Sequence, residues 1–175
     1  MKRLNLGCGT NLKDGWVNAD KFKTRPSVTV MEMEKRFPWP ANYFDEVYAR
    51  HALEHSRDIE FTLEEIKRVT KKNGVVRIIV PHLSSPRAIS DLGHYSYWDS
   101  TSFAKQQRAS KRSYQQKNFF KVKSVLFTRI YTPMFLGFLR GFMLGFANKH
   151  NEFWEMTGKS FFPILEIEYV LLVDK

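Results

Sequence analysis

Residues 3–9 read Arg-Leu-Asn-Leu-Gly-Cys-Gly, a short apolar run that ends on two glycines. The run Arg3–Leu6 predicts a β-strand, and the turn Gly7-Cys8-Gly9 would bring bare backbone to the carboxyl end of that strand. Doubly wound α/β folds bind ligands at this edge of the sheet, where a side chain would fill the ligand's space. Because Gly-X-Gly also occurs in ordinary tight turns, the turn indicates a nucleotide-type site only together with its neighbours.

Acidic residues end the next two predicted strands. Asp20 follows the strand Trp16–Ala19, eleven residues after the last glycine of the turn, where a carboxylate can accept both hydrogen bonds of a ribose diol. Dinucleotide folds usually place that acid roughly 20 residues on, so the short spacing argues against NAD. Glu32 and Met33 end the strand Val28–Met33, where they can contact a purine. The alternative is a core methionine beside a surface charge.

The rest of the chain predicts an α/β fold. One amphipathic helix, Ile59–Lys72, is stopped by Asn73-Gly74. Four further apolar runs predict strands: Glu46–Ala49, Val75–Val80, Phe119–Tyr131 and Ile164–Val173. We therefore expect a doubly wound, seven-stranded, mostly parallel sheet in a single domain spanning residues 1–175, with an antiparallel strand added late.

An apolar insert, residues 132–162, separates the last two predicted strands. Its core, residues 134–147, is almost wholly apolar, with glycines every fourth residue and phenylalanines beside them. A helix there would be shorter than the roughly 20 apolar residues that span a bilayer, and Arg140 interrupts it. We expect this helix to be buried, to pair two copies into a homodimer, or to lie at a membrane interface.

The basic residues are concentrated in one region. Lys and Arg exceed Asp and Glu by ten in the whole chain, and no acidic residue occurs between Asp99 and Glu152. The ten basic residues of that region equal the whole excess. A local excess of this kind attracts anionic partners. Residues 105–149 are therefore expected to contact nucleic acid or an anionic membrane surface, unless they serve solubility alone.

Other features narrow the class of protein. The single cysteine excludes an internal disulfide framework and any site with several cysteine ligands. No charged and apolar leader precedes Leu4-Asn5-Leu6, so no signal peptide is predicted. We expect a cytoplasmic protein that can be peripheral to the membrane, and no metal site.

Four segments of the first half combine into one pattern. They are Leu4-Asn5-Leu6-Gly7-Cys8-Gly9-Thr10, Gly15-Trp16-Val17-Asn18-Ala19-Asp20, Phe37-Pro38-Trp39-Pro40-Ala41-Asn42-Tyr43-Phe44-Asp45-Glu46-Val47 and His51-Ala52-Leu53-Glu54-His55. Together they resemble the class I S-adenosylmethionine-dependent methyltransferases, and more narrowly the small methyltransferase-type-11-like proteins. The likeness runs on to Pro81-His82 and covers about half the chain. Glu32 departs from it where Asp is commoner, and Lys71-Lys72-Asn73-Gly74 replaces a Lys-Pro-Gly-Gly-like turn.

The resemblance implies that S-adenosylmethionine is the cofactor and S-adenosylhomocysteine the product. The implied cofactor-binding residues are Asn5, Gly7, Cys8, Gly9, Asp20, Glu32, Met33, Arg50, His51 and His55. Within this set the glycine turn would hold the methionine moiety, Asp20 the ribose, and Glu32 with Met33 the adenine. Arg50 and His51 would border the sulfonium, and His55 could close over the cofactor.

The resemblance also suggests an acceptor, and positions after the predicted strands suggest catalytic residues. Methyl transfer needs alignment and, for some acceptors, removal of a proton. His82, directly after a predicted strand, is the first candidate base, followed by Asp91 and His94 in the next loop. The narrow group implies O-methyl transfer to a small hydroxyl-bearing, saccharide or lipid-linked acceptor.

Two alternatives remain open. The first is RNA methylation, in which aromatic residues stack on an unpaired base and basic residues hold phosphates. It would use Tyr95, Tyr97, Trp98 and the basic residues between Lys105 and Lys123. The second is a cofactor-binding interaction module that performs no transfer and binds a partner through the apolar insert.

Overall fold

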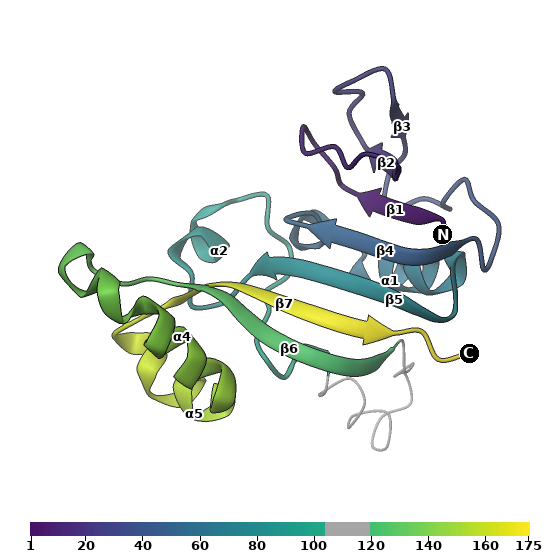
Figure 1. The fold of residues 1–175 in the computed structure, drawn as a ribbon. Helices are drawn as coiled ribbons and strands as arrows, with labels where there is room; N and C mark the ends of the chain where they lie inside the picture. Colours follow the sequence, from purple (N-terminus) through teal and green to yellow (C-terminus); the bar gives the residue numbers. More distant parts are fainter. Residues whose placement is uncertain (104–119) are drawn as a thin grey trace.

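The computed structural model describes residues 1–103 and 120–175. Within this part of the chain, seven strands form one sheet in the order β3-β2-β1-β4-β5-β7-β6 (Figure 1). The strands are β1 (Arg3–Leu6), β2 (Val17–Asp20), β3 (Val28–Val30), β4 (Phe44–Arg50), β5 (Thr70–Pro81), β6 (Lys121–Ile130) and β7 (Ile164–Leu172). The first five run parallel, and β7 pairs antiparallel with β5 and β6. The predicted doubly wound fold, with its late antiparallel strand, is confirmed.

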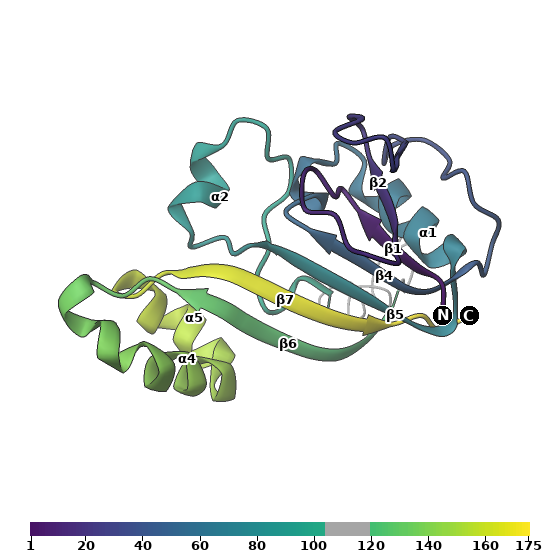
Figure 2. The ribbon, with the colours of Figure 1, turned by 45° about the horizontal axis from the view of Figure 1, so that its top comes forward.

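The helices lie between consecutive strands. They are η1 (Leu53–His55), α1 (Ile59–Val69), α2 (Pro86–Ser90), η2 (Met134–Leu139), α4 (Arg140–Lys149), α5 (Asn151–Met156) and η3 (Gly158–Ser160). Helix α1 contacts β5, and α4 contacts β6. The helices of the insert therefore lie at the edge of the sheet opposite β3 (Figure 1 and Figure 2).

The parallel register brings three strand ends together. Leu6 lies opposite both Ala19 of β2 and Ala49 of β4, and all three side chains are buried. Burial of such apolar side chains on a parallel sheet is the main stabilising contribution in this half of the molecule. As a result, the turn after β1, Asp20 and the segment after β4 meet at one edge of the sheet.

The end of α1 corrects the predicted helix Ile59–Lys72. The helix ends at Val69, where the Thr70 backbone N–H and hydroxyl both donate to Ile66 O and satisfy a terminal carbonyl. The chain then enters β5 without a loop, although Asn73 has φ 59° and a Cβ on Gly74 would lie 2.9 Å from a backbone carbonyl oxygen. Asn73-Gly74 thus belongs to an irregular strand start and not to a helix cap.

The apolar insert differs from the single buried helix considered above. It begins as the short helix η2 and continues as α4, in which Met143 and Ala147 are buried. Phe138 and Phe142 are instead 81% and 76% exposed. A Cβ added at Gly137, Gly141 or Gly145 would meet nothing within 4 Å. Among the described residues, no helix is long and apolar enough to cross a membrane.

Candidate active site

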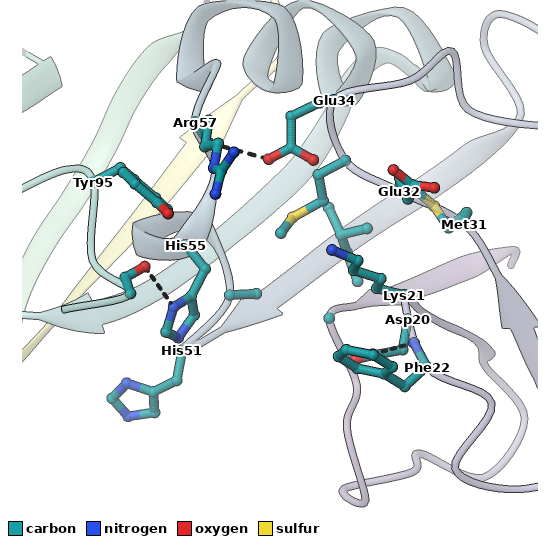
Figure 3. A pocket seen from close by; sticks show the side chains of 15 residues that line it. Asp20, Lys21, Phe22, Met31, Glu32, Glu34, His51, His55, Arg57 and Tyr95 are labelled. Carbon is teal, nitrogen blue, oxygen red and sulfur yellow. Dashed lines mark hydrogen bonds between the residues drawn. The ribbon is translucent and has the colours of Figure 1, made fainter. Parts of the chain in front are cut away.

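A cavity of about 670 Å³ opens at the carboxyl ends of β1, β2 and β4 (Figure 3). Six of the predicted cofactor residues line it: Gly7, Asp20, Glu32, Met33, His51 and His55. Its volume lies within the range of small-molecule sites, which is about 300–1,000 Å³. The sheet edge predicted to bind the cofactor therefore carries a cavity of suitable size.

The glycine turn forms one wall of this cavity. Gly7 has φ 65° and Gly9 has φ 50°, both in the left-handed region that favours glycine. A Cβ on Gly7 would collide with the Cβ of Ala52, which follows β4. The turn thus needs glycine for its backbone geometry and for its close approach to the neighbouring strand end.

Asp20 fastens the glycine turn from the end of β2. Its Oδ2 accepts a hydrogen bond from Gly9 N at 2.8 Å, and its Oδ1 accepts one from Phe22 N at 2.9 Å. An ionised carboxylate has about four lone-pair positions, so two remain for a ribose diol. Asp20 can therefore order the loop and bind a ligand at once.

Other predicted cofactor residues support the site from outside the cavity. Asn5 is buried, and its Nδ2 donates to Asn11 O at 2.9 Å and to Asn18 Oδ1 at 2.8 Å. The Cys8 side chain is buried, and desolvation raises the pKa of its thiol. Arg50 turns toward β7. These side chains shape the loop after β1 and the end of β4, and none lines the cavity.

The opposite wall holds residues that the sequence motifs did not single out as cofactor residues. Glu34 Oε1 accepts a hydrogen bond from Arg57 N at 3.1 Å, and the Arg57 guanidinium lies 5.1 Å from the centre of the Tyr95 ring. Figure 3 shows Arg57 and Tyr95 beside His55, across the cavity from Asp20. Because Tyr95 comes from a loop far along the chain, no local pattern could place it here.

His51 lies at the end of this cavity in a strained conformation. Its φ of 50° is unusual for a residue with a side chain and costs about 1–3 kcal/mol. Its Nε2 lies 2.7 Å from Glu166 Oε2, and its Nδ1 lies 3.4 Å from Glu54 Oε1. The hydrogen bond with Glu166 is the main reason that the pKa of His51 is raised to about 9.

Glu166 is the centre of this polar group. Burial alone would raise its pKa, but hydrogen bonds from His51, Thr128 and Arg50 outweigh burial and hold the pKa well below its usual value. The carboxylate therefore fixes the His51 ring from β7, a strand that the sequence pattern did not connect with the site.

A second cavity, of about 930 Å³, adjoins the first. His51 and His55 line both cavities. The second is lined mostly by polar and charged side chains, among which are Glu54, Arg87, Asp91, His94, Arg129 and Glu166. A ligand in the first cavity and one in the second would meet at the two histidines.

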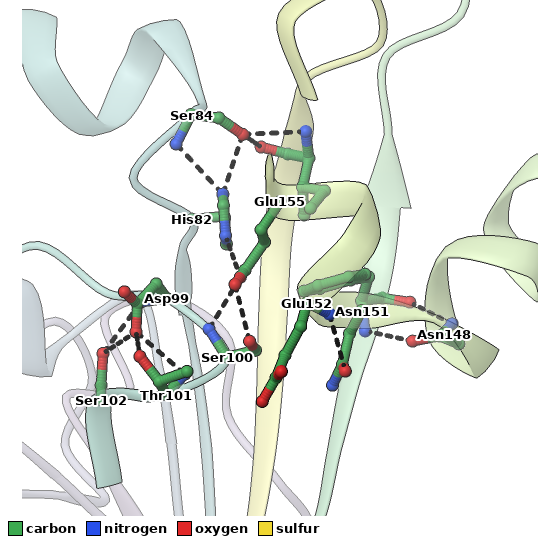
Figure 4. A network of polar contacts seen from close by, with 12 residues as sticks. His82, Ser84, Asp99, Ser100, Thr101, Ser102, Asn148, Asn151, Glu152 and Glu155 are labelled. Atoms are coloured by element: carbon green, nitrogen blue, oxygen red, sulfur yellow. Dashed lines mark hydrogen bonds and ion pairs between the residues drawn. The ribbon is translucent and has the colours of Figure 1, made fainter. Parts of the chain in front are cut away.

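His82 does not reach either cavity, which removes it as the first candidate base. The ring is fully buried, with Nε2 2.8 Å from Glu155 Oε1 (Figure 4). Its Nδ1 accepts a hydrogen bond from Ser84 N at 3.0 Å, so the proton on Nε2 is donated to Glu155. Nε2 connects the end of β5 to α5, Nδ1 contacts Ser84 in the following turn, and His82 therefore has a structural role.

Asp91 and His94, the other predicted catalytic residues, do line the second cavity. Asp91 Oδ1 accepts from Gly93 N at 2.8 Å, and His94 Nδ1 lies 3.0 Å from Ala88 O. Tyr95 and Tyr97 in the same loop are about half exposed, whereas Trp98 is buried against Phe103 and Tyr169. Trp98 is therefore unable to stack on a base as the RNA alternative required.

The first cavity fits S-adenosylmethionine by the chemistry of its walls. The wall at Gly7 offers bare backbone, Asp20 offers free lone pairs for a diol, and Met31 and Met33 offer apolar contact for a purine. The mouth toward the second cavity, at His51 and His55, is where the reactive end of the cofactor would lie.

Comparisons with known proteins agree with this geometry. Residues 4–78 match the family model Methyltransf_11, described as a methyltransferase domain. No curated protein matches the chain significantly.

Several solved structures share the fold at low sequence identity. A putative methyltransferase of Haloferax volcanii, solved in complex with the Trm112 methyltransferase activator, has a TM-score of 0.62 and 16% identity, covering 99% of this chain and 83% of that one. A SAM-dependent methyltransferase of Archaeoglobus fulgidus has a TM-score of 0.65 and 14% identity, covering 98% of this chain and 86% of that one.

These findings favour an enzyme over the interaction module. The family match covers the glycine turn, Asp20 and β4, the same elements that build the first cavity. The described part of the chain therefore has the fold of the class I S-adenosylmethionine-dependent methyltransferases, and residues 4–78 match the methyltransferase-domain family.

Proposed function

We propose that this enzyme transfers a methyl group to a hydroxyl oxygen of a small saccharide or lipid-linked acceptor bound in the second cavity. The observation that carries the proposal is the junction of the two cavities at His51 and His55. The hydroxyl oxygen of an acceptor bound there would approach the methyl group at the sulfonium end of the cofactor, as in-line transfer requires.

The lining of the second cavity supports a polar acceptor with a negative charge. Arg87 and Arg129 are exposed basic side chains on its wall, and guanidinium groups bind phosphate or carboxylate in a bidentate manner. Asp91 and His94 face the same cavity and can accept a hydrogen bond, and then the proton, from an acceptor hydroxyl. A phosphorylated or acidic saccharide satisfies both sets of groups.

Bound S-adenosylmethionine supplies an electrophilic methyl group on its sulfonium. The protein's own contribution is mainly alignment. Glu166 holds the His51 ring at the junction, and the glycine turn with Asp20 fixes the wall against which the cofactor lies. Orientation of this kind accounts for a large part of the acceleration in two-substrate transfers.

Exposed apolar side chains of the insert support a lipid-linked acceptor. We name it the insert face and define it as Met134, Phe138, Phe142, Phe153, Met156 and Phe161, all more than half exposed. Arg140 and Lys149 lie on the same helix α4, and the region from residue 100 to 151 contains no acidic side chain. Apolar side chains flanked by basic ones are typical of contact with an anionic membrane surface.

The RNA alternative is supported less well by the described residues. Five of the basic residues expected to hold phosphates lie outside the described part of the chain: Lys105, Arg108, Lys111, Arg112 and Lys117. Trp98, one of the three aromatic residues expected to stack on a base, is buried in the core. Methylation of RNA would therefore contradict the proposal.

The test is methyl transfer from labelled S-adenosylmethionine to a panel of acidic saccharides, lipid-linked saccharides and RNA. We expect an ether-linked label on the saccharide hydroxyl. Arg129→Gln should raise the acceptor KM about tenfold and leave S-adenosylhomocysteine affinity unchanged, because Arg129 lines only the second cavity. Lys121→Gln, an exposed change at the far end of β6, is the matched control. Label on RNA alone would overturn the proposal.

A further inference from the structure

A compact group of metal-ligating side chains lines the second cavity and reaches the first cavity at His55. Glu54, His55 and His94 each offer one ligand atom, and these atoms lie within 4.8 Å of one another. The residues come from η1 and from the loop after α2, which a hydrogen bond from Tyr95 N to Glu54 O, at 2.7 Å, holds together. The group therefore depends on a tertiary contact between segments about 40 residues apart in the chain.

Glu54 carries the strongest sign of a missing ligand. Its side chain is only 2% exposed, and among the described residues its buried Oε2 has no hydrogen-bond partner. The other oxygen, Oε1, lies 3.4 Å from His51 Nδ1. A buried carboxylate oxygen without a partner is unfavourable, because burial removes its hydrating water and no protein group replaces the lost hydrogen bonds. A bound cation would supply the absent interaction.

The two histidines are held as metal ligands usually are. His55 Nδ1 lies 3.0 Å from Gly93 O, and His94 Nδ1 lies 3.0 Å from Ala88 O. A backbone carbonyl only accepts, so each ring donates its Nδ1 proton and leaves the Nε2 lone pair free in the neutral form. Histidines that bind metals typically donate their other ring nitrogen to a carbonyl or carboxylate in this way.

Gly93 allows the loop to approach His55 this closely. A Cβ at Gly93 would lie in van der Waals contact with His55 Nδ1, at 3.4 Å, and 3.2 Å from Asp91 Oδ1, and the second distance is tighter than most real contacts. Asp91 Oδ2 lies 3.6 Å from His94 Nε2 and provides a carboxylate beside the group.

From these contacts we propose that Glu54, His55 and His94 bind one divalent first-row transition metal ion, such as Zn²⁺, at the wall of the second cavity. Two nitrogens and one carboxylate oxygen suit such an ion, and Mg²⁺ or Ca²⁺ prefers oxygen ligands alone. Metal–ligand bonds of about 2.0–2.2 Å place the ligand atoms of a tetrahedral site about 3.4 Å apart, so binding requires the side chains to move together by roughly 1 Å.

The position also suggests what the ion does, and this part rests on the proposed function. All three ligands and Asp91 line the second cavity, or in the case of His55 both cavities. A metal ion bound there by three side chains keeps positions open for the acceptor hydroxyl, whose acidity it would increase. The released proton would pass to the Asp91 carboxylate, and the oxygen would bond to the methyl carbon as the carbon–sulfur bond of S-adenosylmethionine breaks and S-adenosylhomocysteine leaves.

The test is a metal titration of the whole chain after treatment with a chelator. Calorimetry with Zn²⁺ should give one ion per chain, and Co²⁺ should give a visible absorption band of nitrogen and oxygen ligation. Glu54→Gln and His94→Gln should each weaken Zn²⁺ binding at least about tenfold, with thermal melting showing that the variants remain folded. His150→Gln, an exposed histidine outside the group, should bind like the wild type.

The outcomes separate this proposal from the proposed function. Equal Zn²⁺ affinity in wild type and in the double variant His55→Gln/His94→Gln would overturn the metal site. One-to-one binding that those variants abolish would support it, even if no saccharide in the acceptor panel were methylated. That second failure would count against the acceptor class alone.

Discussion

The Nε2 atom of His51 lies 2.7 Å from the Oε2 atom of Glu166, although 115 residues separate them in the chain. The contact joins the end of β4, next to the first cavity, to the antiparallel strand β7. It holds His51 in a backbone conformation with positive φ at the point where the two cavities meet.

Replacing Glu166 by Gln should impair catalysis more than cofactor binding. Glu166 lines only the second cavity, so the affinity for S-adenosylhomocysteine should change less than threefold, about 0.6 kcal/mol. The turnover number should fall by up to about 100-fold, because a misplaced group at the junction loses alignment. Steady-state kinetics and calorimetry measure the two effects.

The matched control for that experiment is Glu168→Gln on the same strand. Glu168 pairs with Arg77 at 2.7 Å and lines neither of the two cavities. Equal losses of turnover in the two variants would show that the charge of β7, and not the contact with His51, is what matters.

Replacing Gly7 by Ala should abolish tight cofactor binding. The new Cβ would collide with Ala52 at a backbone φ of 65°. Positive φ alone costs Ala about 1–2 kcal/mol, and the collision moves the wall of the first cavity. Calorimetric titration with S-adenosylhomocysteine should show at least about a tenfold loss of affinity, equal to about 1.4 kcal/mol.

Gly15→Ala provides the comparison for Gly7→Ala. Gly15 has φ 73°, but a Cβ there would meet nothing within 4 Å, and the residue does not line the cavity. Because of its positive φ, the Gly15→Ala variant should lose the same backbone free energy of folding as Gly7→Ala. Its affinity for S-adenosylhomocysteine should equal that of the wild type. If both variants bound S-adenosylhomocysteine like the wild type, the glycine turn would not be part of the cofactor site.

The buried pair of His82 and Glu155 should make the protein sensitive to acid. Burial would raise the pKa of Glu155, but hydrogen bonds from His82 and Ser100 outweigh it and lower the pKa below the ordinary value of 4.5. A lowered folded-state pKa contributes stability above the unfolded value, and this contribution is lost as pH falls through the folded value. Stability should therefore decrease below about pH 5.

Glu155→Gln tests this directly. At pH 7 the variant should be about 2–4 kcal/mol less stable, since a buried charged acceptor of three hydrogen bonds is lost. The difference from the wild type should shrink at pH 3, where the wild-type carboxylate is increasingly protonated. Denaturant melts at both pH values measure it, with the exposed Glu152→Gln as control. A difference that stayed constant with pH would contradict this assignment.

The insert face should bind anionic vesicles. Phe142 is 76% exposed on α4, the helix that also carries Arg140, so Phe142→Asp should remove apolar insertion and add repulsion from the lipid headgroups. We expect cosedimentation with phosphatidylserine-containing vesicles to fall at least about fivefold, or about 1 kcal/mol.

Val30→Asp controls for the added charge, because Val30 is 55% exposed on β3 at the opposite edge of the sheet. This variant should pellet like the wild type. Dimers of the wild type that dissociate in Phe142→Asp, without any vesicle binding, would assign the face to a second copy of the chain instead.

The sequence alone determined the half of the fold that builds the first cavity. Strand, glycine turn, second strand and Asp20 follow one another within 20 residues, so their arrangement depends on local backbone preferences and short spacing. Even there, local patterns misplaced the end of α1, because the Thr70 hydroxyl caps Ile66 O where glycine was expected to stop the helix.

Only the tertiary structure decided which polar groups share a cavity. His82 follows a strand as His51 does, yet α5 covers it and Glu155 binds it in the core. Glu166 reaches His51, and the loop with His94 reaches Glu54, through contacts between segments far apart in the chain. Spacing along a sequence cannot specify such contacts, because strand pairing and the burial of charge are properties of the assembled sheet.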